Sequence, residues 1–447
     1  MTQYKDFHGH VFYRRMGHAR PMISHGEGIY LYDTAGKRYI DASGGPVLVN
    51  IGHGVKEVVQ AMAGQAGLAA YVHATMFTSQ ALEDYSAALA EVVPLDNPRF
   101  FYLGSGSEAV ETAIKFARQV QVERGETRRY QIIARWHSYH GTTLGALAMS
   151  GRPGLRQFYE PLLVQTPHIQ PPYCYRCPFK LEYPQCGLRC AYALEEAVKL
   201  NGKDTIAAFL AEPISGASLA AVTPPPEYWP LIRQICDHYG VLLIADEVMT
   251  GFGRTGAWFG IQHWRVEPDI MTMAKGAAGG YFPLSITAMK TADVQAIRRG
   301  RGDFNHGGTF SHHPVGMAAG LAVLRYLQQH NLIEAAQLQG EKLGQKLQAA
   351  FGEHAHIGDI RGRGLMWGLE FVADRETREP FPAERGLAKK VGDAAFDRGL
   401  IIYPSGGNVD GLRGDQVMVA PPFIVTDEQL DEIVGLLAAA IGAALEL

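Results

Sequence analysis

Residues 240–248 read GVLLIADEV, an unbroken apolar run that ends in two carboxylates. Apolar residues without alternation are typical of a strand covered on both faces, as in a parallel sheet. Open α/β sheets bind their ligands beyond the carboxyl ends of such strands. We therefore predict a buried strand whose end presents Asp246 or Glu247 to a ligand; an N-cap or a structural ion pair is the alternative role for either acid.

Similar apolar runs alternate with helical patterns between about residue 99 and residue 290. This alternation predicts right-handed βαβ crossovers and a doubly wound α/β fold, in which a mostly parallel central sheet carries helices on both faces. The other strand candidates are residues 99–103, 130–135, 206–213, 269–275 and 285–290.

The rest of the sequence predicts a smaller α+β domain. It contains helical patterns at residues 314–330, 332–353 and 385–398 and from residue 426, with strand candidates between them. A predicted hairpin within residues 28–45 is expected to pack against this part. The expected division is an N-terminal segment of the small domain (1–60), a large domain (61–315) and a C-terminal small domain (316–447).

The composition excludes several classes of protein. Of the 447 residues 47% are hydrophobic and 19% are charged, and the net charge is -4. Without a basic excess, neither nucleic acid nor an anionic membrane is expected as a partner. The sequence has no apolar stretch of membrane-spanning length and no apolar signal core, so we expect a cytoplasmic protein.

A glycine-rich turn follows the predicted strand at 99–103. From Ala109 onward apolar residues recur at helical spacing, which places Ser105, Gly106 and Ser107 at a helix N-terminus. Free backbone N–H groups and the helix dipole make this position an anion site, and an ordinary capped turn is the alternative.

Two glycine motifs also admit a nicotinamide dehydrogenase. Residues 104–109 fit G-x-G-x-x-A, and residues 251–256 (GFGRTG) fit G-x-G-x-x-G. The sequence after GFGRTG does not predict the helix that a dinucleotide site needs. The dehydrogenase therefore stays an alternative from a different class.

Lys275 ends the strand candidate that follows Asp246. It lies in an uncharged stretch, MAKGAAGGYFPLS (273–285), so burial should lower its pKa from about 10.4. A lysine that is partly neutral can form a Schiff base with a carbonyl compound. The alternative is a lysine that extends to solvent, which the neighbouring glycines disfavour because they admit a ligand or another backbone.

Four cysteines cluster between residues 174 and 190 in a C-x2-C-x8-C-x3-C pattern. Cys174, Cys177, Cys186 and Cys190 could form two disulfides, bind zinc or remain free thiols, and the sequence leaves these three states open. No H-E-x-x-H or G-x-S-x-G motif occurs, and no catalytic metal is expected.

Taken together, the motifs resemble those of the class III aminotransferases, pyridoxal 5'-phosphate (PLP) enzymes of fold type I. The resemblance covers essentially the whole chain and is nearest to the ω-amino acid and amine:pyruvate transaminases. The matching stretches are GSGSEA (104–109), YHGTT (139–143), AEP (211–213), DEVMTGFGRTG (246–256), AKG (274–276) and GGTFSHHPVG (307–316).

The resemblance implies roles for residues around the cofactor ring. Lys275 matches the lysine that binds PLP covalently and then moves the substrate proton. Asp246 matches the acid that keeps the pyridine nitrogen protonated. Val248 and Tyr139 match the residues on the two ring faces, and Glu212 lies close to the site in such enzymes, with a role left open.

The resemblance also implies the phosphate site and the assembly. Ser105, Gly106 and Ser107 match the phosphate-binding turn. Thr309 matches a threonine that completes this site from a partner subunit, so a homodimer is expected, with a tetramer as the alternative.

The implied reaction is transfer of an amino group from an amine or ω-amino acid to a small keto acid such as pyruvate, in ping-pong half-reactions. Met249 replaces the glutamine common in ornithine and aminobutyrate enzymes. Arg413 lies near where ω-amine transaminases keep a mobile arginine for the substrate carboxylate, and a surface arginine is the alternative. Within the family, the alternative function is that of an aminomutase or a decarboxylase.

Overall fold

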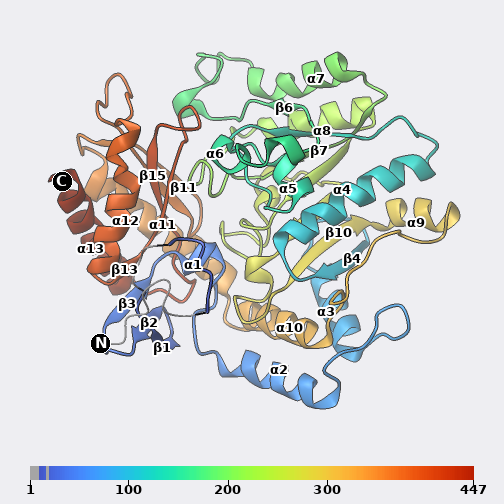
Figure 1. Cartoon of the computed structure of the whole chain (residues 1–447), viewed down its shortest axis with the longest axis horizontal. Coiled ribbons are helices and arrows are strands. Elements are labelled where there is room, and N and C mark those ends of the chain that lie inside the picture. Colours follow the sequence, from blue (N-terminus) through green and yellow to red (C-terminus); the bar gives the residue numbers. More distant parts are fainter. Residues whose placement is uncertain (1–9, 17–19, 447) are drawn as a thin grey trace.

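The computed structural model describes residues 10–16 and 20–446 (Figure 1). A seven-stranded sheet in the order β4-β10-β9-β8-β7-β5-β6 forms the centre of the larger part. Only β10 is antiparallel to its neighbours in this sheet; all other described pairs are parallel. The strands are β4 (Pro98–Leu103), β5 (Gln131–Arg135), β6 (His168–Ile169), β7 (Ile206–Ala211), β8 (Leu242–Asp246), β9 (Ile270–Met273) and β10 (Ser285–Lys290).

The predicted doubly wound α/β fold is confirmed. Every residue of β7, β8 and β9 is buried, as expected for strands that are covered on both faces. The six strand candidates all form strands of this sheet. The edge strand β6 was missed, because two residues are too few to give an apolar pattern.

Nine helices of the described chain accompany this sheet. Helix α4, which follows β4 in the chain, packs across β4, β10, β9, β8 and β7. Its buried residues, among them Val110, Ala113 and Ala117, recur at helical spacing and form the apolar face that drives this packing. The helices are α2 (Lys56–Leu68), α3 (Gln80–Ala90), α4 (Gly106–Glu123), α5 (Leu144–Met149), α6 (Pro153–Arg156), α7 (Arg189–Asn201), α8 (Tyr228–Tyr239), α9 (Thr291–Arg299) and α10 (Pro314–Gln329).

The smaller part combines the two ends of the described chain. Its sheets run β1-β2-β3-β13 and β11-β12-β15-β14, and the parallel pairing of β3 with β13 joins N-terminal to C-terminal strands. Its elements are β1 (Ile23–Glu27), β2 (Tyr30–Asp33), β3 (Arg38–Asp41), α1 (Gly44–Val47), α11 (Leu332–Phe351), β11 (Ile357–Gly362), β12 (Trp367–Phe371), α12 (Leu387–Asp397), β13 (Leu400–Ile401), β14 (Tyr403–Gly406), β15 (Asp415–Val419) and α13 (Asp427–Glu446).

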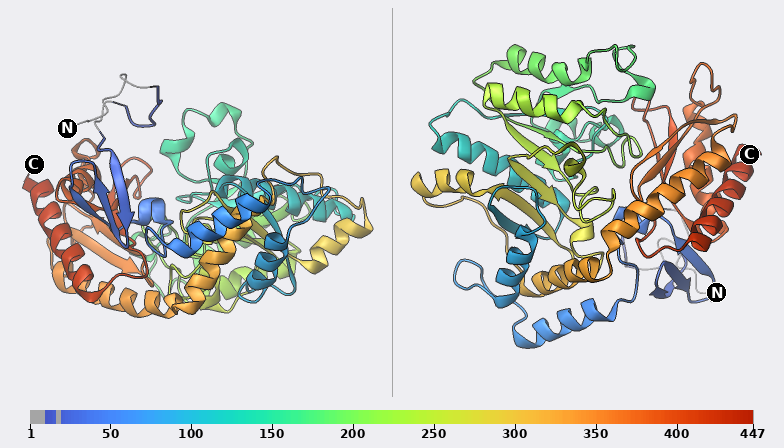
Figure 2. Two further views of the ribbon diagram at one scale, coloured as in Figure 1. Left: turned by 90° about the horizontal axis from the view of Figure 1, so that it is seen from below. Right: turned by 180° about the vertical axis from the view of Figure 1, so that it is seen from behind.

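Figure 2 shows how the two parts are connected: α10 lies against the larger part, and α11 continues from it along the smaller part. Within the described residues no helix is long and apolar enough to cross a bilayer. The domain boundaries at residues 60 and 315 stay a prediction.

The cysteine cluster lies between β6 and α7. Cys174, Cys177, Cys186 and Cys190 are free thiols here and line one small cavity. Across residues 10–16 and 20–446 no group of three or more His, Cys, Asp or Glu side chains is arranged to hold a metal ion.

The loop after β7 is hydrogen-bonded to the sheet β11-β12-β15-β14 of the smaller part. Arg361 of β11 donates hydrogen bonds to the carbonyl oxygens of Leu219 (2.7 Å) and Ala220 (3.0 Å). Gly368 of β12 lies against the same loop, and a Cβ added there would be 2.1 Å from the Ala220 oxygen. The two parts therefore meet with no room for a side chain at this point.

We expect Gly368→Ala to lower the free energy of unfolding by roughly 1–3 kcal/mol, because the new methyl group must push backbone apart. Urea unfolding followed by circular dichroism measures this change. Gly442→Ala in α13 is the matched control: nothing lies within 4 Å of the added Cβ, so it should stabilise by about 0.5–1 kcal/mol. Equal effects of the two substitutions would contradict the close approach.

Candidate active site

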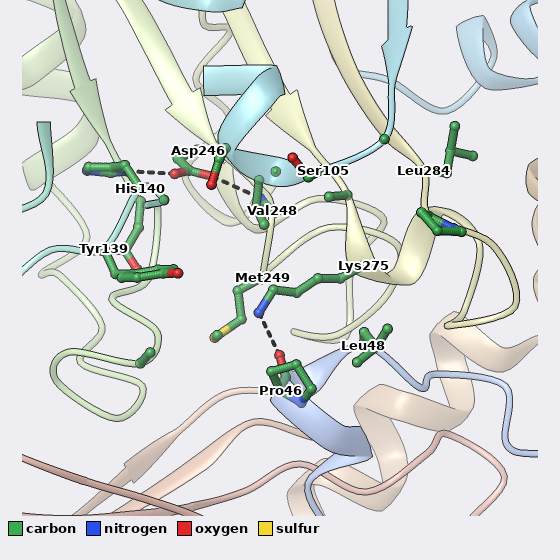
Figure 3. Close-up of a pocket in the computed structure, with 18 of the residues that line it drawn as sticks. Pro46, Leu48, Ser105, Tyr139, His140, Asp246, Val248, Met249, Lys275 and Leu284 are labelled. Carbon is green, nitrogen blue, oxygen red and sulfur yellow. Dashed lines mark hydrogen bonds and ion pairs between the residues drawn. The ribbon is translucent and has the colours of Figure 1, made fainter. Parts of the chain in front are cut away.

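One cavity of about 400 Å³ lies at the carboxyl edge of the central sheet. The strands β4, β5, β7, β8 and β9 run in the same direction, so the residues that follow them meet there. Seven of the nine predicted site residues line this cavity: Ser105, Gly106, Ser107, Tyr139, Asp246, Val248 and Lys275. Figure 3 shows Ser105, Tyr139, Asp246, Val248 and Lys275 around it.

Asp246, the last residue of β8, is the acid that faces the cavity. Its side chain is buried and its two oxygens are engaged: Oδ2 lies 2.6 Å from His140 Nδ1, and Oδ1 accepts from the Thr272 hydroxyl and the Val248 N–H, both at 3.1 Å. The Asp246 carboxylate is thus fixed by groups from β9 and from the loop after β5. His140, to which the sequence assigned no role, orients the Asp246 carboxylate.

Glu247 faces away from the cavity. It accepts hydrogen bonds from the backbone N–H groups of Gly260 (2.8 Å) and Ile261 (2.7 Å) at the start of the 3-10 helix η3 (Gly260–Trp264) and from the Thr250 hydroxyl. Burial raises its pKa to about 7. Of the two acids that the sequence left open, Glu247 therefore has a structural role, because successive strand residues point to opposite sides.

Lys275 extends into the middle of the cavity (Figure 3), where its Nζ donates a hydrogen bond to the Pro46 carbonyl oxygen at 2.5 Å. Its backbone is left-handed (φ 45°) at the start of the 3-10 helix η4 (Lys275–Ala277). The surrounding protein lowers the pKa of Lys275 to about 8, chiefly through loss of hydration. Asp246 and Glu212 oppose this shift because they stabilise the charged amine.

The serine and glycine turn caps α4 at the opposite side of the cavity. Ser105 is the N-cap, and its hydroxyl contacts the Glu108 N–H (3.4 Å) and Glu108 Oε2 (2.8 Å). A Cβ at Gly106 would lie 3.0 Å from a Val248 methyl group, so the helix starts in close contact with the residues that follow β8. The first N–H groups of an 18-residue helix thus face the cavity.

Two predicted residues lie outside this cavity. Thr309 is exposed in the turn before α10. Arg413 is on the surface, 46% exposed, and pairs with Asp410 (2.8 Å) and Glu379 (3.0 Å). Neither lines the cavity within one chain, so their assigned roles stay predictions.

Three cavity residues were missed or left without a role by the sequence. Glu212 is buried beyond β7, burial raises its pKa, and its Oε1 accepts from the Gly216 N–H at 2.9 Å. Pro46 and Arg14 reach the cavity from the N-terminal part of the chain. No local pattern identifies them, because only the tertiary fold brings them to the sheet edge.

A doubly wound sheet whose edge presents an acid, a lysine of lowered pKa and a helix N-terminus is the arrangement of fold type I PLP transferases. The family model Aminotransferase class-III matches residues 12–441. The chain therefore belongs to the class III aminotransferases.

Known proteins resemble this chain over nearly its full length. The uncharacterized aminotransferase YodT of Bacillus subtilis is 40% identical, covering 95% of this chain and 96% of YodT. Putrescine–pyruvate aminotransferase of Pseudomonas aeruginosa is 33% identical, with 93% of this chain and 89% of that protein covered. The crystal structure of an (S)-enantioselective ω-transaminase from Thermomicrobium roseum superposes with a TM-score of 0.89 at 36% identity, covering 96% of this chain and 93% of the other.

We expect Lys275 to react with trinitrobenzenesulfonate at a rate that rises with pH and is half-maximal near pH 8, because its neutral form predominates above its pKa of about 8. Peptide mass spectrometry of ligand-free protein labelled between pH 6 and pH 10.5 measures this. Lys199 is the internal control: its hydrogen bond to Glu195 raises its pKa, so its labelling should still increase at the top of the range. A shared midpoint for the two lysines would contradict the effect of burial.

Proposed function

We propose that this aminotransferase uses PLP to move an amino group from an amine or ω-amino acid to a small keto acid such as pyruvate, in two half-reactions. The observation that carries the proposal is the placement of Lys275 and Asp246 in one cavity opposite the N-terminus of α4. The use of pyruvate is supported by the similarity to the putrescine–pyruvate aminotransferase of Pseudomonas aeruginosa.

The charges in the cavity fit PLP at three points. The Asp246 carboxylate would hold a proton on the ring nitrogen, and the N–H groups at Ser105, Gly106 and Ser107 would hold the phosphate. The Lys275 amine would hold the aldehyde carbon covalently. When bound, PLP supplies an electron sink that stabilises negative charge on the substrate carbon next to the amino group.

The chain's own residues then position groups and move protons. His140 and Thr272 each bond to one oxygen of the Asp246 carboxylate and would so keep it in position to hold the ring nitrogen of PLP. Lys275 is the base that takes the proton from the substrate carbon and returns it. Its lowered pKa keeps a usable neutral fraction near neutral pH.

The apolar residues of the cavity wall favour a substrate with an apolar chain. Leu48, Ile214, Ala217, Met249 and Leu284 line it. The apolar wall favours an amine or ω-amino acid over a donor with charges along its chain. Arg413 could reach a substrate carboxylate only after leaving Asp410 and Glu379, and its role in substrate binding stays a prediction.

Aminomutase or decarboxylase chemistry is the second candidate function. It would be favoured if no donor yields amino-group transfer to any keto acid.

Two single substitutions test the proposed chemistry. Lys275→Ala should abolish transamination, and Asp246→Asn should lower kcat by about two orders of magnitude or more, because the ring nitrogen loses its acid partner. Spectrophotometric assay of alanine formation from pyruvate measures both. Asp269→Asn is the matched control, since Asp269 is bound to Arg233 and Lys290 at the opposite end of the same strands.

Asp269→Asn should reduce stability and leave kcat within a few-fold of the parent. Unchanged activity in Lys275→Ala would refute the proposed mechanism.

We further propose a homodimer in which Thr309 of each subunit completes the phosphate site of the other. An exposed apolar patch formed by Phe310 and Tyr71 supports this: Phe310 is 68% and Tyr71 is 41% exposed, and the two rings pack edge-on with centroids 6.5 Å apart. Surface patches of this kind mark protein interfaces. The patch adjoins a second cavity that shares Gly104 and Phe282 with the active site.

We expect the wild-type protein to have twice the 48.9 kDa chain mass in light scattering and Phe310→Glu to shift toward monomer. Leu412→Glu is the control, because Leu412 is 75% exposed but lies beside Arg413, outside the patch. Thr309→Ala should remain dimeric and bind PLP more weakly in a fluorescence titration. A monomeric wild-type protein with full activity would exclude the proposed assembly.

A further inference from the structure

The four clustered cysteines between β6 and α7 take no part in the proposed reaction. Cys174 begins the 3-10 helix η2 (Cys174–Arg176), Cys177 follows this helix, Cys186 lies in a turn, and Cys190 lies in the first turn of α7. All four residues line one cavity of about 20 Å³, which has room for about one water molecule. The fold thus brings two pairs of thiols, separated in the sequence by a loop, to the same point.

The geometry of this cluster suits neither a metal ion nor an organic ligand. Among the residues that the structure describes, no three His, Cys, Asp or Glu side chains are arranged to hold a metal ion. The cavity is also far smaller than the sites of organic ligands, which measure roughly 300–1,000 Å³. Neighbouring thiols can instead form a disulfide, which needs no further group in the cavity.

The thiols differ in how readily they can react. Cys174 is the exposed member of the cluster, and the other three are half-buried. Burial raises the pKa of Cys190 to about 12, so almost none of this thiol is the reactive thiolate near neutral pH. Burial also raises the pKa of Cys174, and a charge on Cys186 adds more to this shift than a charge on Cys177. Cys186 is therefore the stronger electrostatic neighbour of the exposed thiol.

The stretch that contains Cys174 also forms a contact between the two parts of the chain. The Tyr173 hydroxyl and the Arg176 guanidinium both donate hydrogen bonds to the carboxylate of Glu370 in β12, which is fully buried. Arg361, which holds the loop after β7, donates to the same carboxylate at 2.8 Å. A restraint on Cys174 therefore acts on the residues through which the larger part contacts the smaller one.

We propose that Cys174 and Cys186 form a reversible disulfide, so that the cluster is a site of oxidative modification which stabilises the segment between β6 and α7 and its contact with the smaller part. The bond would join η2 to the turn before α7 and close the loop between them. A closed loop restricts the unfolded chain and so favours the folded segment. A bond from Cys174 to Cys177 would join residues of one turn and restrict the chain far less.

The co-reactant is a small disulfide such as oxidised glutathione. The Cys174 thiolate attacks one of its sulfur atoms, a glutathione thiolate leaves, and a mixed disulfide remains on Cys174. The Cys186 thiolate then attacks the Cys174 sulfur, which forms the protein disulfide and releases the second glutathione thiolate. Two protein thiols are thereby oxidised and one glutathione disulfide is reduced, and the two glutathione thiolates take up the protons that the protein thiols lose.

Trypsin digestion shows the pairing directly, because each cysteine of the cluster lies in a peptide of its own. The four cysteines are separated by cleavage after Arg176, Lys180 and Arg189. The folded protein is incubated with oxidised glutathione at about pH 8.5, where more of each thiol is ionised. Mass spectrometry without reductant should then show Cys174 linked to Cys186, and dithiothreitol should remove this link. Buried Cys236 is the internal control and should stay a free thiol.

Matched variants separate this bond from other pairings, and none of the readouts depends on turnover. Oxidation should raise the Tm of the parent by about 2–5 °C, because the bond restricts the unfolded chain. Cys186→Ser should abolish both the link and the shift, whereas Cys190→Ser should keep both. A lasting mixed disulfide on Cys174, a bond from Cys174 to Cys177, or zinc bound by the purified protein in place of free thiols would overturn the proposal. An unchanged Tm in the oxidised parent would overturn the stabilising role.

Discussion

The hydrogen bonds of one carboxylate, that of Asp246, organise this molecule's active site. They join the end of β8 to Thr272 in β9 and to His140 beyond β5, so three neighbouring segments share one buried anchor. Lys275 follows Thr272 by three positions, and the distance between acid and amine is therefore set by the sheet itself. A site built on strand ends is held more firmly than one built on loops.

The smaller part of the chain supplies the rest of the cavity. Arg361 and Gln416 hold the carbonyl oxygens of the loop that carries Ala217, and Tyr403 of β14 lines the cavity directly. The groups proposed to be catalytic thus lie at the edge of one sheet, whereas part of the cavity wall depends on how the second sheet packs. The same fold can therefore keep its chemistry while its substrate range changes.

Much of the fold, and the meeting of Asp246 and Lys275 in one cavity, could be predicted from the sequence, because the signals are local. Continuous apolar runs identify buried strands, and Asp246 and Lys275 each lie at the end of one. The Asp246–His140 contact and the entry of Arg14 could not be predicted from the local sequence, since both join segments that are far apart in the chain. One short run, residues 400–404, divides between β13 and β14 in different sheets, a break that apolar pattern does not reveal.

Lys275 has a left-handed backbone although it is not glycine. Such a conformation costs on the order of 1 kcal/mol, and it persists only where the surrounding structure enforces it. Strand residues direct their side chains alternately to the two faces of a sheet, where helices would enclose them. By leaving that alternation, the chain directs this amine past the sheet edge into the cavity, where it meets the Pro46 carbonyl oxygen. The protein thus accepts a small loss of stability at this residue in exchange for an amine that lies in a cavity at the edge of the sheet.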